Sequence, residues 1–396
     1  MSKNRPLLSV ALVLMVSLAA CNLYSPSTSP ISTPDSPLPS PTPLPSPTWM
    51  PTAAPSSTPT TTPVPTPTET PMSTPVPLYT DGVWECWDRG QSVPCPYDAS
   101  LSLKQMAFVS DTEAWAVGAN GYIARWDGYT WTRVASPTDK DLNDVAFLAP
   151  DDGWAVGEGG VILHWDGSVW SVVREPQPDP PAGGYYLIWN GVAFSEPDDG
   201  WVVGCMDSEG GATLQAMHWD GTEWQDSLLP IAWTSYRLEA ITVLSPQDIW
   251  AVGGGFRGIT LHWDGSRWQE ISNPFSSQTS PPAWFYSISA HSPDNVWIAG
   301  LRAADRGGTE GTALRWNGKE WLDGYLPPTE WVLAILIISE NDGWVGGNEL
   351  FHWNGQGWER AANPAEDRIV DIESSPNGGV WALTQYGAFL RLEISQ

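Results

Sequence analysis

The chain has 396 residues, including 38 Pro, 37 Gly and 26 Trp, and its formal net charge is −27. Proteins that bind nucleic acid or an anionic lipid surface neutralise phosphates with clustered Lys and Arg, and this chain has only four Lys. The composition therefore excludes both as primary partners, and it leaves the high Trp content to be explained.

The first segment, residues 1–20, has the pattern of a lipoprotein signal peptide. Lys3 and Arg5 precede an apolar run of about a dozen residues, which is too short to cross a bilayer. The run ends in Leu-Ala-Ala-Cys at 18–21, which resembles the bacterial lipobox. That resemblance implies cleavage before Cys21, lipidation of its sulfur and anchoring to the outer face of a bacterial cell membrane. A cleaved signal peptide without a lipid is the alternative.

Residues 21–77 form a linker composed almost wholly of Pro, Ser and Thr. Such a segment cannot bury enough apolar surface to fold, and its prolines favour polyproline II. At about 3.1 Å per residue the linker would reach roughly 150 Å. We therefore expect it to hold the folded part, residues 78–396, away from the membrane, and stalks of this composition can carry O-glycans.

A repeated unit begins after the linker. One marker is Trp-Ala-Val-Gly at 115–118, and a second is Trp-Asp/Asn-Gly-x-x-Trp, which occurs six times. Self-similarity at this period is typical of propellers and solenoids. The seven copies of the first marker begin at Trp115, Trp154, Trp201, Trp250, Trp297, Trp344 and Trp381.

Within a unit the pattern predicts four short strands joined by tight turns. In the second unit we expect strands at 144–147, 154–156, 161–165 and 169–173, the last two joined by an Asp-Gly hairpin turn. Helical periodicity is absent from comparable windows. Four antiparallel strands per unit make a propeller blade, so the fold class is all-β, a seven-bladed β-propeller.

The last unit predicts only three strands, at 369–372, 381–383 and 389–392, before the sequence ends. Residues 81–88 resemble the start of a fourth strand. We expect this N-terminal strand to complete the last blade, because a closed ring leaves no sheet edge unpaired.

Three cysteines follow the linker. Cys86 and Cys95 are nine residues apart, and an extracytoplasmic location allows a disulfide between them to persist. Such a bridge would fasten the closing strand and contribute about 2.5–3 kcal/mol. Cys205 remains, either as a buried small hydrophobic residue or as a thiol exposed by the loop that follows it.

The units resemble the repeats of the photosystem II stability/assembly factor family. The likeness rests on Asp-Asp-Gly-Trp-Ala-Val-Gly at 151–157 and Ile-Leu-His-Trp-Asp-Gly at 162–167, and it covers residues 81–396. More distantly the units resemble the Asp-box repeats of sialidases, although Trp-Asp-Gly-x-x-Trp is one residue shorter. The resemblance implies a propeller with a non-enzymatic binding or assembly role, and propellers also host unrelated activities.

The histidines do not predict a metal site. His164, His218, His262 and His352 each precede the first Trp of a hairpin marker, so they are spread around the ring. Two other blades have Arg at this position, and His291 has no partner at ligand spacing. We expect no metal and no cofactor. The Asp-rich turns could hold Ca²⁺, but none shows the spacing of a known calcium loop.

The recurrent Asp residues raise the possibility of a paired-carboxylate glycosidase. We interpret them instead as turn residues, because the Asp that precedes Gly in four hairpins is replaced by Asn317 and Asn354 in two others. Asn keeps the turn chemistry but cannot act as an acid or base. No phosphate-binding loop, serine nucleophile motif or Cys/His pair is found.

The second-to-third turns and the links between blades form one end of a propeller, here called the loop-rich end. It holds the large insertions at 205–214, 254–258 and 301–312 and the long links 175–188, 229–237 and 273–286. Loops on a rigid frame commonly carry function. We predict an aromatic and cationic ligand-binding platform made of Trp233, Trp284, Trp331, Tyr185, Tyr186, Tyr236, Arg257, Arg302 and Arg306.

The sequence thus predicts a monomeric, surface-exposed bacterial lipoprotein whose propeller binds a protein or a glycan without catalysing a reaction. Two alternatives remain open, which are a sialidase-like or other glycan-processing enzyme and a structural component of the cell surface.

Overall fold

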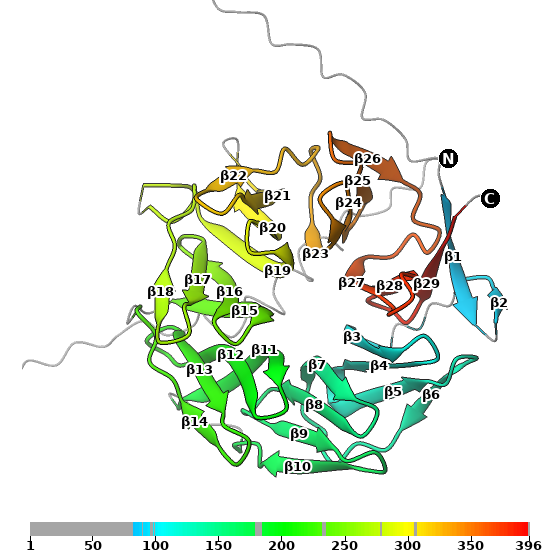
Figure 1. The fold of residues 1–396 in the computed structure, drawn as a ribbon, viewed down its shortest axis with the longest axis horizontal. Coiled ribbons are helices and arrows are strands. Elements are labelled where there is room, and N and C mark those ends of the chain that lie inside the picture. Colours follow the sequence, from blue (N-terminus) through cyan, green and yellow to red (C-terminus); the bar gives the residue numbers. More distant parts are fainter. Residues whose placement is uncertain are drawn as a thin grey trace, which may run out of the picture. The chain divides into compact units, whose positions relative to one another are not determined.

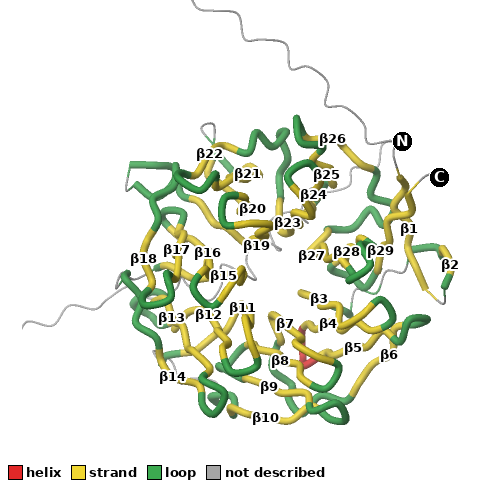
Figure 2. The backbone as a smooth tube through the Cα atoms, in the orientation of Figure 1, coloured by secondary structure: helices red, strands yellow, loops and turns green. Residues whose placement is uncertain are grey.

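The computed structural model describes residues 82–394, except 89, 96–97, 99, 179–183, 232–234, 278 and 305–306. The predicted signal peptide, Cys21 and the linker lie outside the described residues. Within the described ranges no helix is long and apolar enough to cross a membrane. Figure 2 shows strands joined by loops around a ring, with one short 3₁₀ helix, η1 (Ala119–Gly121).

Seven four-stranded blades, numbered from the first marker, make up the described ring (Figure 1). Blade 1 contains β3 (Leu103–Ser110), β4 (Glu113–Gly118), β5 (Tyr122–Trp126) and β6 (Trp131–Val134). Blade 2 contains β7 (Leu142–Ala149), β8 (Asp152–Gly157), β9 (Ile162–Trp165) and β10 (Trp170–Arg174). Blade 3 contains β11 (Tyr186–Glu196), β12 (Asp199–Asp207), β13 (Thr213–Trp219) and β14 (Trp224–Asp226).

Blade 4 contains β15 (Tyr236–Ser245), β16 (Asp248–Gly255), β17 (Ile259–Trp263) and β18 (Trp268–Glu270). Blade 5 contains β19 (Ala283–Ser292), β20 (Asn295–Ala303), β21 (Thr309–Trp316) and β22 (Trp321–Asp323). Blade 6 contains β23 (Val332–Ser339), β24 (Asp342–Gly347), β25 (Leu350–Trp353) and β26 (Trp358–Ala361). Blade 7 contains β27 (Ile369–Ser374), β28 (Val380–Thr384), β29 (Phe389–Ile394) and β1 (Gly82–Asp88).

The strands of each blade are antiparallel and follow chain order from the centre outwards, except in blade 7. The predicted blade pattern is therefore confirmed. Blades 4 and 5 share one sheet, because Gly254 of β16 also pairs with Trp284 of β19. An added Cβ at Gly254 would lie 2.1 Å from the Ala283 carbonyl oxygen, so only Gly permits this close approach.

The ring closes as predicted. β1 forms the outer strand of blade 7 and pairs antiparallel with β29, with Gly82 opposite Ile394. Cys86 and Cys95 form the predicted disulfide, which ties β1 to the segment after the short strand β2 (Gln91–Ser92). The strand that completes the last blade thus comes from the other end of the propeller sequence. With β1 in place, blade 7 has four strands like the other blades.

Trp side chains fill the space between blades. The ring of the marker Trp115 in blade 1 lies 4.7 Å from Trp165 and 5.6 Å from Trp170 of blade 2, between centroids. The same packing recurs at four more interfaces, where Trp154 meets Trp219 and Trp224, Trp201 meets Trp263 and Trp268, Trp250 meets Trp316 and Trp321, and Trp297 meets Trp353 and Trp358. The high Trp content is therefore mainly architectural.

The closing blade uses the same packing with residues from both ends of the domain. Trp84 of β1 lies 5.1 Å from the blade 6 marker Trp344, edge to face. The blade 7 marker Trp381 lies 5.6 Å from Trp126 of blade 1. Trp84 therefore takes the place of a hairpin Trp, although its spacing in the sequence departs from the repeat.

The Asp-Gly hairpins are turns, as predicted. The carboxylate of Asp166 accepts N–H bonds from Ser168 and Val169, both at 2.9 Å, and Gly167 has a φ of 89°. The Ser168 hydroxyl also donates to this carboxylate at 2.6 Å, and this bond together with the two N–H bonds lowers the pKa of Asp166 to about 2. Asn317 makes the same pair of bonds, to the N–H groups of residues 319 and 320. The Asn replacements thus retain the turn without an ionisable group.

Candidate functional site

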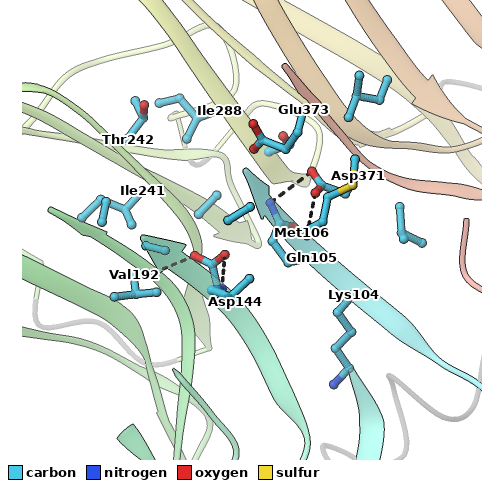
Figure 3. A pocket seen from close by; sticks show the side chains of 18 of the residues that line it. Lys104, Gln105, Met106, Asp144, Val192, Ile241, Thr242, Ile288, Asp371 and Glu373 are labelled. Atoms are coloured by element: carbon cyan, nitrogen blue, oxygen red, sulfur yellow. Dashed lines mark hydrogen bonds between the residues drawn. The ribbon is translucent and has the colours of Figure 1, made fainter. Parts of the chain in front are cut away.

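A channel of about 730 Å³ runs through the centre of the ring and is lined by the inner strand of every blade (Figure 3). Its wall differs from blade to blade. Blade 6 contributes the aliphatic residues Leu333 and Leu336, whereas blades 2, 4 and 7 contribute carboxylates. The four carboxylates that line the channel are Asp144, Glu239, Asp371 and Glu373.

Two of these carboxylates join neighbouring blades. Asp144 of blade 2 accepts the Val192 N–H of blade 3 at 2.7 Å, and Asp371 of blade 7 accepts the Met106 N–H of blade 1 at 2.9 Å. Ser287 makes the equivalent bond from blade 5 to blade 6, at 3.1 Å. All three occupy the same position of the inner strand. Their role in holding adjacent inner strands together is therefore structural, and it does not require a charge.

Glu239 and Tyr286 have no such role. They follow the first apolar residue of the inner strand in blades 4 and 5, and among the described residues neither side chain has a hydrogen bond. The nearest opposite charge for Glu239 is Arg237, which is itself paired with Asp207 at 2.6 Å. Some of the Glu239 surface remains open to the channel, yet the surrounding protein raises its pKa to about 7.

Burial also raises the pKa of the other carboxylates in the wall. The pKa of Asp144 and that of Asp371 rise to about 7 despite their backbone hydrogen bonds. The pKa of Glu373 lies well above its usual range, because burial is reinforced by the nearby charges of Asp371 and Asp144. Burial and Glu239 together raise the pKa of Tyr286. The channel thus holds acidic groups with few compensating cations.

The platform predicted at the loop-rich end is only partly exposed. Tyr236 and Arg257 are both 6% exposed. The Arg257 guanidinium lies over the Tyr236 ring at 5.7 Å, forms an ion pair with Glu270 and donates to the Ser276 carbonyl at 2.8 Å. These two residues therefore belong to the packing under the loops, which corrects the prediction that they form part of an open surface.

Other members of the predicted platform are half-buried. Trp284 lies in β19 where blades 4 and 5 join, and Trp331 is covered by the Arg368 guanidinium at 4.7 Å. The Lys140 ammonium lies 5.9 Å from the centre of the Tyr186 ring, and Arg302 pairs with Glu310 at 2.6 Å. Trp233 and Arg306 lie outside the described residues.

Three aromatic side chains are strongly exposed on the loops and links of this end. Tyr185 is 71% exposed, Phe256 69% and Tyr325 83%. Only Tyr185 was predicted from the sequence. Tyr325 also has a φ of 52°, a left-handed conformation that is unfavourable for a bulky residue. Phe256 precedes the buried Arg257, so the residue that reaches solvent in this turn is the neighbour of the one predicted.

The histidines have a structural role, each within its own blade. His164 lies opposite the marker Trp154, and the two ring centroids are 4.5 Å apart with the planes tilted by 47°. His164 also bonds Asp152 at 2.9 Å, and Asp152 accepts the Trp154 indole N–H. His218, His262 and His352 have equivalent partners in their blades. Among the described residues no group of three His, Cys, Asp or Glu could hold a metal ion.

Every blade has a basic residue opposite its marker Trp, which is His in four blades and Arg in three. The blade 1 residue Arg125 lies over Trp115 and bonds Glu113 at 2.8 Å. In blade 5 Arg315 lies over the marker Trp in the same way, but Asn295 replaces the acid. Blade 7 has Arg391. This seventh copy was not recognised in the sequence, because the hairpin marker is missing there.

Three further side chains of blades 3 and 5 are buried. Trp189 of β11 and Phe285 of β19 occupy a position of the inner strand that is apolar in every blade, and they are 1% and 0% exposed. Cys205 is buried within β12.

The sequence matches no protein-family model and no curated protein. Solved structures, however, share the fold. YCF48 bound to D1 peptide is 18% identical, with a TM-score of 0.52 over 82% of this chain and 100% of that one. YCF48 from Cyanidioschyzon merolae is 18% identical, with a TM-score of 0.51 over 78% and 99%. Streptogramin B lyase is 14% identical, with a TM-score of 0.55 over 79% and 98%.

The chain is a β-propeller that resembles YCF48. The likeness expected from the repeat motifs is therefore confirmed at the level of the fold. At these identities the resemblance extends to the fold alone, and the neighbours include a lyase as well as a peptide-bound propeller. The function of this propeller therefore depends on the chemistry of its own loops and channel.

Proposed function

We propose that this protein is an extracytoplasmic, lipid-anchored lipoprotein whose propeller binds a protein or glycan partner through the loop-rich end. The lipobox-like sequence at 18–21 and the Pro/Thr/Ser-rich linker support the anchoring. The peptide-bound propeller among the similar structures supports a binding role by analogy.

The observation that carries the proposal is the exposure of Tyr185, Phe256 and Tyr325 on the loops of one end. Water solvates large aromatic surfaces poorly, and rigid aromatic side chains are common anchors of protein and sugar recognition. The inner strands of blades 3 to 5 are also longer than the others, with 11, 10 and 10 residues. These blades therefore present a raised and aromatic rim.

The binding role is tested with the triple variant Tyr185→Ser, Phe256→Ser, Tyr325→Ser on the lipid-anchored protein. Photo-crosslinking on intact cells and a glycan array would be compared with wild type. We expect the crosslinked partner or the glycan signal to be lost. Tyr129→Ser is the matched control, because Tyr129 is 56% exposed in a hairpin of blade 1. Equal signals from wild type and the triple variant would refute the loop-rich end as the binding surface.

The anchoring is tested separately with Cys21→Ser. We expect this change to move the protein from the membrane fraction to the soluble fraction and to abolish incorporation of labelled palmitate. Retention of both properties would contradict lipidation at Cys21.

An enzyme remains the second candidate, because the channel carboxylates have raised pKa values of the kind found in catalytic acids. Asp144 and Asp371 are committed to backbone hydrogen bonds, which leaves Glu239 and Glu373 as the acids that could react. Hydrolysis of a glycan panel that is lost in Glu373→Gln would favour the enzyme over the scaffold.

A further inference from the structure

We infer that the central channel binds an alkylammonium group, the chemistry shared by free aliphatic diamines and by the lysine side chains of a partner. This inference concerns the channel and does not depend on the proposed role of the loop-rich end. It rests on which polar groups of the wall have partners, on the charge of the wall and on its apolar side.

The unpartnered groups of the wall indicate a ligand. Asp144 and Asp371 each accept the N–H of the next blade, so their presence is explained by the fold. Glu239 and Tyr286 line the channel without a hydrogen bond to any described residue. Glu239 and Tyr286 are half-buried, and polar groups that the protein partly surrounds ordinarily have hydrogen-bond partners, because an unmade hydrogen bond is costly. A donor bound in the channel would supply the missing partner of Glu239.

The charge of the wall selects a cation. Four carboxylates line the channel, and the two cations that line it already have other contacts, since the Lys104 ammonium pairs with Asp141 at 2.9 Å and the Arg368 guanidinium covers Trp331. Burial raises the pKa of Glu239 to about 7, and the nearby Arg237 offsets this rise only in part. A positively charged ligand would provide the counter-charge, whereas an anion would add to the repulsion.

An organic cation fits the wall better than a metal ion. Glu239 and Glu373 stand on β15 and β27, with two blades between them, and no three described His, Cys, Asp or Glu residues converge on one point. A bare ion therefore lacks a coordination shell here. An alkylammonium ligand can place its charge at one carboxylate and its methylene groups against Leu333 and Leu336 of blade 6.

The repeat itself shows that an ammonium can be accommodated at the wall. Lys104 in blade 1 occupies the position that Glu239 has in blade 4 and Leu333 has in blade 6. The variant Leu333→Lys would therefore carry its own ammonium into the channel from a tolerated position. It should occupy the site and exclude an added ligand.

The test uses calorimetric titration of the full propeller-containing chain with 1,5-diaminopentane and, separately, with the peptide Gly-Gly-Lys-Gly-Gly. Neutral 1,5-pentanediol, the norleucine peptide and Mg²⁺ serve as probes for apolar and non-specific charge effects. We expect an amine to bind at one site and the neutral probes not to bind. Tighter binding of the peptide would identify a partner's lysine as the source, and tighter binding of the diamine a free amine.

Variants locate the site. Glu239→Gln should weaken amine binding by about tenfold or more, since one charge pair is lost, and Leu333→Lys should abolish it. The matched control is Glu223→Gln, an exposed acid in the β13–β14 hairpin, which should bind as wild type does. Thermal melts would confirm that each variant is folded. Equal binding of Mg²⁺ and the amines, or unchanged binding in Glu239→Gln and Leu333→Lys, would overturn the inference.

Discussion

The Trp layers between blades and the wall of the central channel are built from the same repeat, yet they differ in how strictly they keep it. Between blades the marker Trp and its neighbours recur with nearly constant ring distances, from 4.7 to 5.2 Å for the closest pair at five interfaces. At one position of the channel wall, by contrast, successive blades carry Lys104, Asn143, Asn190, Glu239, Tyr286, Leu333 and Val370.

This difference separates stability from binding. A side chain that is the same in every blade stabilises the ring, because every interface between blades has the same geometry and is filled by the same side chains. A position that changes from blade to blade is free of that constraint. We therefore expect substitutions in the Trp layers to lower the free energy of unfolding strongly, and most substitutions in the channel to change it little.

The largest effect is expected from Trp250→Ala in blade 4. Trp250 is 2% exposed and packs against Trp316 and Trp321 of the next blade, so its removal should cost about 3–5 kcal/mol of unfolding free energy. Urea unfolding followed by Trp fluorescence measures the loss. Tyr286→Phe in the channel is the control, and an equal loss in that variant would break the distinction between the two regions.

The disulfide gives the next largest effect. The double variant Cys86→Ser, Cys95→Ser should lose about 2.5–3 kcal/mol, because the bridge closes a short loop that holds the closing strand β1. Unfolding of wild type in a reducing buffer should reproduce the loss. Cys205→Ser, which leaves the bridge intact, is the comparison for removing a thiol. A double variant as stable as wild type would show that β1 does not need the bridge.

The channel carboxylates predict how stability depends on pH. The pKa of Asp144, Glu239 and Asp371 is about 7 in the folded protein, above the ordinary value, so the folded state binds protons that the unfolded state releases between about pH 4 and pH 7. Stability should therefore rise as the pH falls from about 8 to about 5, by about 1–2 kcal/mol once water in the channel screens the charges.

Glu239→Gln, which cannot ionise, should flatten part of this pH dependence in thermal melts. The hairpin carboxylates oppose the trend at low pH, because hydrogen bonds lower the pKa of Asp166, Asp220 and Asp264 to about 2. These carboxylates stabilise the folded protein at pH values above their ordinary pKa, and this stabilisation is lost as the pH falls towards 2. Stability that increased steadily from pH 5 to pH 8 would contradict the assignment of the channel acids.

The smallest change in stability is expected from a substitution in blade 5, where the residue two before the marker Trp is not an acid. Asn295→Asp would place a carboxylate beside Arg315, as Glu113 stands beside Arg125 in blade 1, and should stabilise the protein by about 0.5–1 kcal/mol. Glu113→Gln removes the equivalent charge in blade 1 and should destabilise it by a similar amount. Denaturant midpoints compare the two, and a destabilised Asn295→Asp would show that the blades are not interchangeable here.

The blades, the closing strand and the disulfide could all be predicted from the sequence, because each follows from a local signal. Trp115 and its copies mark the second strand, Asp-Gly marks the hairpin, and Cys86 and Cys95 are near neighbours. The channel was not predicted, because its carboxylates are separated in the sequence and carry no shared motif. Each inner strand has one position that is apolar in all seven blades. A comparison of the residues that follow this position would have revealed Glu239 one residue after it, and Asp144 and Asp371 two residues after it.

The loop-rich end was predicted less well than the blades. The sequence predicts Trp331 and Tyr236 as members of the platform because they are aromatic residues of the loop-rich end, but exposure depends on which neighbours cover them. Arg368, which covers Trp331, lies in another link, and Arg257, which lies over the Tyr236 ring, comes from a turn of blade 4. Such long-range cover has no periodic signature, and so the exposed residues Phe256 and Tyr325 were missed.

The pairing of Gly82 with Ile394 brings the two ends of the propeller together as neighbours in one sheet. A ring whose ends adjoin has no structurally privileged first blade. Circular permutation should therefore be possible, with a short peptide joining Ile394 to Gly82 and new termini opened in a link between two other blades. In such a permutant the Pro/Ser/Thr-rich segment at 21–77 could be joined to a different blade, and under the proposed anchoring another side of the same propeller would then face the membrane.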